Sequence, residues 1–259
     1  PDSSKIDEAN YRESMFQTRV SAGYPLRPGS KWRARVSQHL QASKFTNGPI
    51  PNLRAFDNQH PAQASGGRQQ TTEWRASVGY DSRDHGTTTG KGSFLDLFGE
   101  SSIRGLASSY DYNRWGTDGR VFLPWPSDPT KVFAIQTRFE QLTGSTPPFW
   151  LQSRLGGKYS LRAYGDGRFV DRGMAVVNAE QRFNVYEAKM AGVTTEFQLA
   201  PFVGAGTVFD SPEKMHRRFV RPVIGTAVRA VAKPQVVGSI DFAVGQEGLS
   251  VFMDINYSF

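Results

Sequence analysis

The sequence of 259 residues contains no cysteine. Disulfides, thiolate zinc sites and cysteine nucleophiles are therefore all excluded. The chain also lacks any stretch near the roughly 18 consecutive apolar residues that a membrane-spanning helix needs, and its mean hydropathy is −0.48. A helical membrane protein is excluded on these grounds.

Histidine is scarce as well, with four in the chain: His39, His60, His85 and His216. None lies in a nucleophile motif, and no two have the spacing of metal ligands. Gly204-Ala205-Gly206 is no phosphate loop, because it lies in an alternating segment with no helix after it. We expect no enzyme, no metal and no cofactor; a lipid-acting barrel enzyme is the remaining catalytic alternative.

Charge of one sign is in excess, with 31 Lys and Arg against 24 Asp and Glu, a net charge of +7. Such a balance suits nucleic acid, an anionic membrane surface or a basic channel. The arginines alternate with carboxylates and form no basic stripe with exposed aromatic residues, so a nucleic-acid partner is not expected.

The chain is rich in turn formers and aromatic residues, with 26 Gly, 18 Phe, 9 Tyr and 5 Trp. Its last nine residues alternate strictly, which indicates a strand with one apolar face. An aromatic residue closing such a strand is typical of the assembly signal of outer-membrane β-barrels, although an edge strand of a soluble β-sandwich has the same pattern. The residues expected on the lipid face are Val251, Met253, Ile255, Tyr257 and Phe259.

The same alternation recurs along the chain, and it places Arg19, Arg33 and Arg35 on the polar faces of residues 16–24 and 31–40. An arginine on the lipid face costs about 2–4 kcal/mol at mid-membrane, so these faces point to a wet lumen. We count about eleven strands. Because single-chain bacterial barrels have even strand numbers, we expect about twelve, with sixteen, completed by missing upstream strands, as the second possibility.

Connections between the expected strands differ in length. Those at 25–30, 125–130, 186–192 and 233–235 are short, and those at 45–70, 144–172 and 209–217 are mostly long. Short periplasmic turns opposite long extracellular loops characterise transmembrane barrels. The expected fold is an all-β, antiparallel, up-and-down transmembrane β-barrel formed by one domain, residues 1–259.

Residues 155–169 read Leu-Gly-Gly-Lys-Tyr-Ser-Leu-Arg-Ala-Tyr-Gly-Asp-Gly-Arg-Phe. This stretch resembles the sixth extracellular loop of the BamA/TamA superfamily of outer-membrane barrels. Residues 80–84 and 90–94 are similar to an earlier turn and strand start of the same barrels, and the resemblance covers about residues 71–259. The residues that carry the loop motif are Gly156, Gly157, Leu161, Arg162, Ala163, Tyr164, Gly165, Arg168 and Asp171.

The resemblance implies that the loop at 145–172 folds into the lumen and that Arg162 pairs there with acidic side chains. Glu180 matches one family partner. The second partner is missing, because Gly204 occupies the position where the family often has Asp, and Ala163 replaces the motif glycine. We expect a lumenal ion pair between Arg162 and Glu180, since a confined guanidinium needs a carboxylate.

By the same resemblance, the chain would be an integral protein of the bacterial outer membrane that assists insertion or translocation of other proteins through an openable seam. The implied partners are outer-membrane lipid and lipopolysaccharide, the assembly machinery, and client proteins or a second barrel chain. The alternative is a passive pore or membrane anchor. That alternative is favoured by one departure, since family insertases carry periplasmic repeat domains that this sequence does not show.

Overall fold

The structure is a computed structural model that describes residues 9–49, 54–55, 57, 67–144, 147–190, 193–232 and 236–259. Within these ranges, no helix is long and apolar enough to cross a membrane. Short 3-10 turns are present at Phe149–Leu151, Pro212–Lys214 and Arg217–Phe219. The strands are β1 (Ala9–Pro25), β2 (Trp32–Asn47), β3 (Arg54–Ala55), β4 (Gln69–Asp81), β5 (Gly92–Ser102), β6 (Tyr112–Trp125), β7 (Asp128–Thr143), β8 (Ser153–Leu155), β9 (Phe169–Asp171), β10 (Gly173–Met190), β11 (Val193–Phe209), β12 (Arg221–Ala232), β13 (Val236–Gly245) and β14 (Gly248–Ile255).

One twelve-stranded sheet contains every strand except β8 and β9. Its long strands form an antiparallel meander in the order β14-β13-β12-β11-β10-β7-β6-β5-β4-β2-β1. The twelfth strand is the two-residue β3, which pairs with β1 in parallel. The antiparallel up-and-down architecture and the number of about twelve strands are therefore confirmed, although the twelfth strand is not part of the meander.

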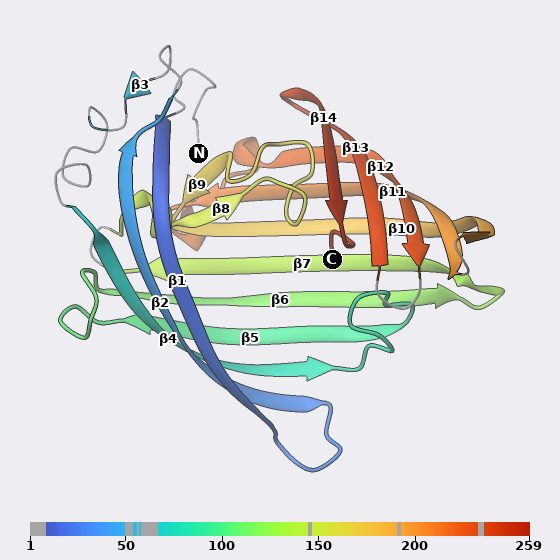
Figure 1. Cartoon of the computed structure of the whole chain (residues 1–259), viewed down its shortest axis with the longest axis horizontal. Coiled ribbons are helices and arrows are strands. Elements are labelled where there is room, and N and C mark those ends of the chain that lie inside the picture. Colours follow the sequence, from blue (N-terminus) through green and yellow to red (C-terminus); the bar gives the residue numbers. More distant parts are fainter. Residues whose placement is uncertain are drawn as a thin grey trace.

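The sheet has two free edges, β1 on one side and β14 on the other, apart from the short contact of β3. Figure 1 shows a strongly curved wall with these edges apart and with the β8–β9 hairpin in the space that the curve encloses. Strand β1 has 17 residues and β14 has 8. Across the described residues β1 and β14 do not pair, so the wall is open along this seam.

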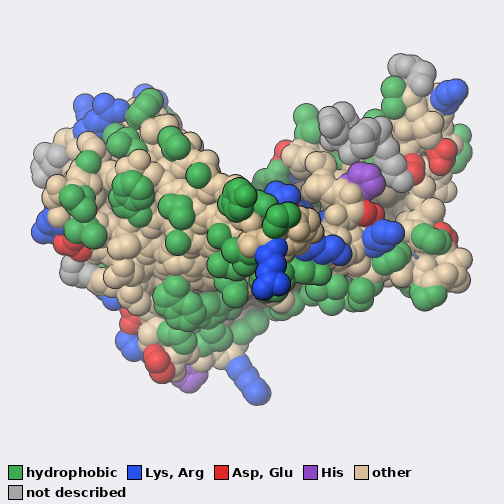
Figure 2. All heavy atoms as spheres, turned by 90° about the horizontal axis from the view of Figure 1, so that it is seen from below, with side chains coloured by type: hydrophobic (Ala, Val, Ile, Leu, Met, Phe, Trp, Pro, Cys, Tyr) green, Lys and Arg blue, Asp and Glu red, His purple; other side chains and the backbone are tan. Residues whose placement is uncertain are grey.

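Successive side chains of each strand point to opposite faces of the wall, as the period of two requires. Large apolar side chains on the outer face are exposed, for example Val20 at 69%, Ile224 at 62% and Met253 at 75%. Ala227 and Asp241, on the inner face, are fully buried. Figure 2 shows hydrophobic side chains spread over the wall of the larger lobe, with charged ones gathered in the adjoining hollow and at the margins.

Connections at the two ends of the wall mostly differ in length, as predicted. The long connection 144–172 joins β7 to β10, whereas β6 and β7 are joined by two residues at the opposite end. Two connections depart from this division: 82–91 is long although it lies at the short-turn end, and 246–247 is short although it lies at the long-loop end. The first of these connections reaches the inner face, where the main-chain oxygen of Thr89 accepts a hydrogen bond from Arg182.

Candidate functional site: a buried ion cluster on the inner face

The connection between β7 and β10, residues 144–172, packs against the inner face of the sheet. Its side chains Leu155, Leu161 and Tyr164 are at most 1% exposed. They belong to one apolar cluster with Val208 of β11 and Val223 of β12. Burial of this apolar surface holds the connection, hereafter the inner loop, against the sheet.

Gly156 and Gly157 allow the sharp turn that brings the inner loop back on itself. Their φ angles are +124° and +84°, values that residues with a side chain rarely adopt. A Cβ atom on Gly156 would lie 2.2 Å from the main-chain oxygen of Gly165. The glycine pair of the motif is therefore a requirement of the loop's backbone.

Arg162, the arginine of the motif, is 1% exposed. Its Nη1 atom donates to Oε2 of Glu180 at 2.8 Å and to Oδ2 of Asp241 at 3.2 Å. The guanidinium carbon also lies 3.4 Å from the ring centroid of Phe202, a cation–π geometry. The structure thus brings together Arg162 and Glu180, the pair expected from the sequence.

Asp241 on β13 is a second acidic partner, so the expectation that this partner is missing is wrong. Gly204 on β11 leaves no room for one, because a Cβ atom there would lie 2.3 Å from Oδ1 of Asn178. Asp241 is fully buried and accepts hydrogen bonds from the hydroxyl groups of Ser239 and Ser258. The second carboxylate is thus supplied by a strand two positions further along the sheet.

Glu180 on β10 is shared by three guanidinium groups. Arg229 of β12 binds it through both Nη atoms, at 2.6 and 2.8 Å, and Nε of Arg182 lies 2.9 Å from Oε1. With Arg162 and Asp241, these residues form what we call the ion cluster, and each is at most 3% exposed. Buried charges at this depth require paired, hydrogen-bonded partners.

Sequence reasoning missed Arg182, Arg229 and Asp241. A signal for two of them is present, since Arg229 is the one charged residue in 222–232 and Asp241 the one charged residue in 236–245. A lone charge in an otherwise apolar or small-residue strand needs a buried partner. Arg182 carries no comparable signal, because its strand contains several charged residues.

The chain leaves β14 after Ile255, and the prediction of a strand through Phe259 is wrong. Val251, Met253 and Ile255 lie on the outer face as expected, with 50%, 75% and 67% of their surface exposed. Tyr257 and Phe259 do not follow them; they turn inward and are 7% and 9% exposed.

Asn256 causes this reversal, because its φ of +143° interrupts the alternation of the strand. Residues 256–259, hereafter the end segment, then pack inside the wall. Tyr257 clusters with Val231 and Val237 and donates its hydroxyl to Gln198 at 2.8 Å. Burial raises the pKa of Tyr257 above its usual value.

Arg182 connects the ion cluster to the end segment. Its Nη2 atom donates to the main-chain oxygen of Phe259 at 3.0 Å, and its guanidinium lies 4.1 Å from the ring centroid of Tyr257. Its Nη1 atom donates to the main-chain oxygen of Thr89 at 3.2 Å. One guanidinium therefore contacts β10, the end segment and the 82–91 connection.

The 82–91 connection contains the second stretch that resembled the family. Asp81 and Arg83 form a bidentate pair, with Nε to Oδ1 at 3.0 Å and Nη2 to Oδ2 at 2.9 Å. Burial by itself raises the pKa of Asp84, but main-chain N–H donors of Lys91, Gly90 and His85 outweigh it and lower that pKa. These contacts shape the connection that reaches Arg182.

The inner loop also contacts the end of the chain directly. Nζ of Lys158 donates to the main-chain oxygen of Asn256 at 2.8 Å, and burial lowers the pKa of Lys158. Tyr159 donates its hydroxyl to Asp254 at 2.5 Å, which raises the pKa of Tyr159 to about 12. The inner loop thus contacts the end segment at Asn256 and the end of β14 at Asp254.

The remaining motif residues lie at the margins of the ion cluster. The main-chain oxygen of Ala163 accepts the hydroxyl of Ser250 at 2.9 Å, and Tyr164 donates to the main-chain oxygen of Pro222 at 3.2 Å. Arg168 lies 2.9 Å from Glu247. Two motif residues remain. A Cβ atom on Gly165 would meet nothing within 4 Å, and the side chain of Asp171 accepts a hydrogen bond from the main-chain N–H of Arg172.

In the described part of the chain, no group of three or more His, Asp or Glu could hold a metal ion. His39 lies 3.0 Å from Glu73 on the inner face, and His85 lies 3.8 Å from Asp84. His216 lies in the β11–β12 connection, and His60 lies outside the described residues.

Comparison with solved structures supports the architecture. BamA from Haemophilus ducreyi lacking POTRA domains 1–3 matches with a TM-score of 0.69 and 17% identity, over 97% of this chain and 55% of that one. CdiB from Acinetobacter baumannii matches with a TM-score of 0.57 and 14% identity, over 95% of this chain and 42% of that one. The chain thus spans about half the length of these structures. No curated protein matches it in sequence.

The sequence profile of the Omp85 superfamily domain matches residues 2–235, which is most of the chain. That range contains the inner loop with Arg162, and strands β10 and β12, which supply Glu180, Arg182 and Arg229 of the ion cluster. Asp241 and the end segment lie beyond it. The chain belongs to the Omp85 superfamily.

Proposed function

We propose that this chain forms the barrel domain of a bacterial outer-membrane protein, over residues 1–259, that assists insertion or translocation of other outer-membrane proteins. Its partners would be outer-membrane lipid, the assembly machinery and unfolded client chains. No catalytic step is involved. Membership of the Omp85 superfamily and the apolar outer face support this proposal.

The open seam is the observation that carries the proposal. Strand β1 is a long edge strand, and within the described residues its free edge pairs with β3 alone, at Ala9 and Asn10. An unpaired edge presents a row of N–H and C=O groups that can accept another strand. A strand of the client protein could therefore pair with this edge before the client passes into the membrane.

The end segment controls the other side of the seam. Because Tyr257 and Phe259 are held inside the wall, the residues after Ile255 are withdrawn from the sheet edge. The same residues, together with the inner loop, cover the inner face around the ion cluster. Coverage of the inner face by two segments favours an insertion or translocation role over a passive pore.

A disulfide lock tests the role of the seam, and the absence of native cysteine makes engineered pairs unambiguous. The pair Tyr257→Cys with Val237→Cys joins two side chains that pack together, and it would hold the end segment inside. The control pair Ala230→Cys with Gly238→Cys joins facing residues of β12 and β13, which are already paired.

The full chain, reconstituted in liposomes, would be assayed for assisted insertion of an unfolded barrel client by protease protection. In this proposal the end segment must return to the sheet edge to release the client, so we expect oxidation of the first pair to reduce insertion to the level of empty liposomes, reduction to restore it, and the control pair to have no effect. Unchanged insertion in the locked protein, or steady conductance without assisted insertion, would support the pore or anchor alternative instead.

A further inference from the structure

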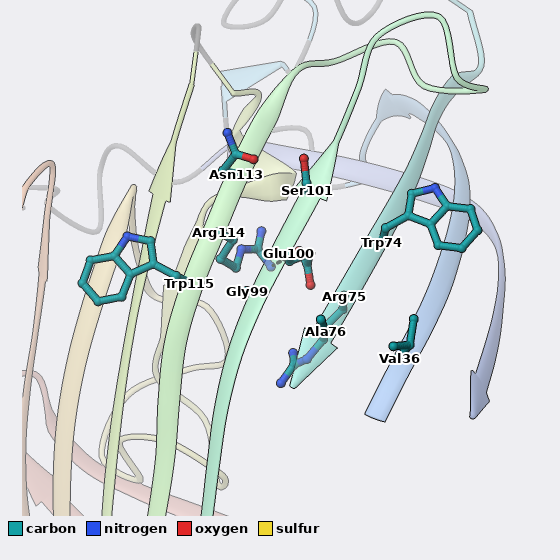
Figure 3. A pocket seen from close by; sticks show the side chains of 10 residues that line it. All are labelled: Val36, Trp74, Arg75, Ala76, Gly99, Glu100, Ser101, Asn113, Arg114 and Trp115. Carbon is teal, nitrogen blue, oxygen red and sulfur yellow. Dashed lines mark ion pairs between the residues drawn. The ribbon is translucent and has the colours of Figure 1, made fainter. Parts of the chain in front are cut away.

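A groove on the outer face of the wall lies near the long-loop end of β4, β5 and β6. It is a shallow, open groove with a volume of about 480 Å³. Figure 3 shows Trp74 and Trp115 on opposite sides of Gly99. Gly99 faces Ala76 on one neighbouring strand and Trp115 on the other.

The floor of the groove is low because its residues are small. A Cβ atom on Gly99 would meet nothing within 4 Å, and Ala76 adds a single methyl group. The tryptophans come from β4 and β6, which lie two strand spacings, or about 10 Å, apart. The floor between these strands is therefore wide enough for one extended hydrocarbon chain.

The groove is apolar along its length and polar at one end. Trp74, Trp115 and Val36 line it with exposed hydrophobic side chains, at 50%, 49% and 54%. At the long-loop end lie Ser101 and Asn113, which face each other across β5 and β6. An apolar trough that ends in hydrogen-bonding side chains matches an acyl chain attached to a polar head.

The exposed tryptophans lie in two rows across the wall, and these rows indicate where the groove lies across the membrane. Trp74 and Trp115 are near the long-loop end, whereas Trp32 and Trp125, exposed by 41% and 42%, are near the short-turn end. Aromatic side chains of membrane barrels gather at the two membrane–water interfaces. Since long loops of such barrels are extracellular, the groove lies at the outer interface.

We propose that this groove binds one acyl chain of lipopolysaccharide, with its hydrocarbon over Gly99 and Ala76 and its ester or amide linkage at Ser101 and Asn113. Exposed Arg68, just before β4, lies on the headgroup side and suits a phosphorylated lipid. The proposal rests on the outer-membrane location proposed above and is independent of the insertion activity.

Gly99→Leu tests the groove by filling its floor with a side chain that the open space can hold. Gly238→Leu is the matched control, because Gly238 also has open space around it and lies on β13, away from the groove. The full chain would be purified from outer membranes in mild detergent, and its retained lipid identified by native mass spectrometry.

We expect the wild-type protein and Gly238→Leu to retain lipopolysaccharide and Gly99→Leu to lose at least tenfold in occupancy. Trp74→Ala and Trp115→Ala should lower the occupancy severalfold. Equal retention by Gly99→Leu, no retained lipid in the wild type, or retention of phospholipid alone would overturn the proposal. Absence of the chain from fractionated outer membranes would overturn the location as well, whereas its presence there without lipopolysaccharide overturns the groove alone.

Discussion

Arg182 on β10 donates a hydrogen bond of 3.0 Å to the main-chain oxygen of Phe259, which lies 77 residues away in the sequence. The same guanidinium binds Glu180 through Nε at 2.9 Å. The end segment and the ion cluster therefore share one side chain. Any movement of the end segment out of the lumen must break a contact of this cluster.

Replacing Arg182 should release the end segment. Arg182→Met keeps an extended side chain but removes the donors to Phe259 and Thr89, so we expect amide protection from hydrogen exchange at residues 257–259 to fall about tenfold, roughly 1.4 kcal/mol. Arg182→Lys retains charge without the planar fork and should have an intermediate effect. Arg75→Met is the control, because Arg75 pairs with Asp96 on a different part of the wall. Unchanged protection in Arg182→Met would contradict this role.

Neutralising Glu180 should destabilise the barrel more than neutralising Asp241. Glu180→Gln leaves three buried guanidinium groups with one carboxylate, and loss of a buried partner costs about 3–5 kcal/mol. Asp241→Asn should cost less, because its contact with Arg162 is longer, at 3.2 Å, and the amide oxygen can still accept from one of the two serine hydroxyl groups while the amide nitrogen donates to the other. Urea unfolding in detergent micelles, followed by tryptophan fluorescence, measures both, and equal losses would count against the central position of Glu180.

A methyl group at Gly156 should detach the inner loop. Gly156→Ala places a side chain at a positive φ and against the main-chain oxygen of Gly165, whereas Gly165→Ala meets no atom within 4 Å. Strain of this kind costs on the order of 1–3 kcal/mol. Limited trypsin digestion should cleave Gly156→Ala faster after Arg154 or Arg168, with Gly165→Ala behaving as wild type. Equal digestion of the two variants would show that the turn tolerates the change.

Acid should loosen the 82–91 connection. Because its hydrogen bonds lower the pKa of Asp84 in the folded state, this carboxylate contributes stability above the usual aspartate pKa and loses it as the pH falls through the lowered value. Hydrogen exchange at Gly90 and Lys91, corrected for the intrinsic pH dependence, should therefore accelerate at acidic pH. Asp84→Asn should remove this dependence, and a wild-type profile without it would refute the assignment.

The strands were predictable because the alternation of apolar and polar residues is local. Arg162 and Glu180 were predictable for another reason, since the motif around Arg162 is contiguous in the sequence and Glu180 lies in the next strand. Arg229 and Asp241 were not found, because pairing with Glu180 depends on the order and register of β10 to β13. Strands β10, β12 and β13 contact the inner loop together only because the sheet is curved.

The end of the chain shows the limit of the local pattern. Tyr257 and Phe259 continue the alternation of Val251, Met253 and Ile255 and were therefore placed on the outer face. The structure places them inside, where Phe259 packs with Phe122, Val132 and Ala134. The alternation ends at Asn256, which has a positive φ, and Tyr257, Ser258 and Phe259 are all buried after it.

The sequence by itself determined the all-β class, the two faces of each strand and the family, because these depend on residue order over short stretches. The tertiary structure alone decided that Asp241 replaces a missing acid, that Arg182 joins three segments, and that the seam between β1 and β14 is open. Each of these depends on which side chains meet across the curved wall, and a buried charge takes whatever partner the packing brings within hydrogen-bonding distance.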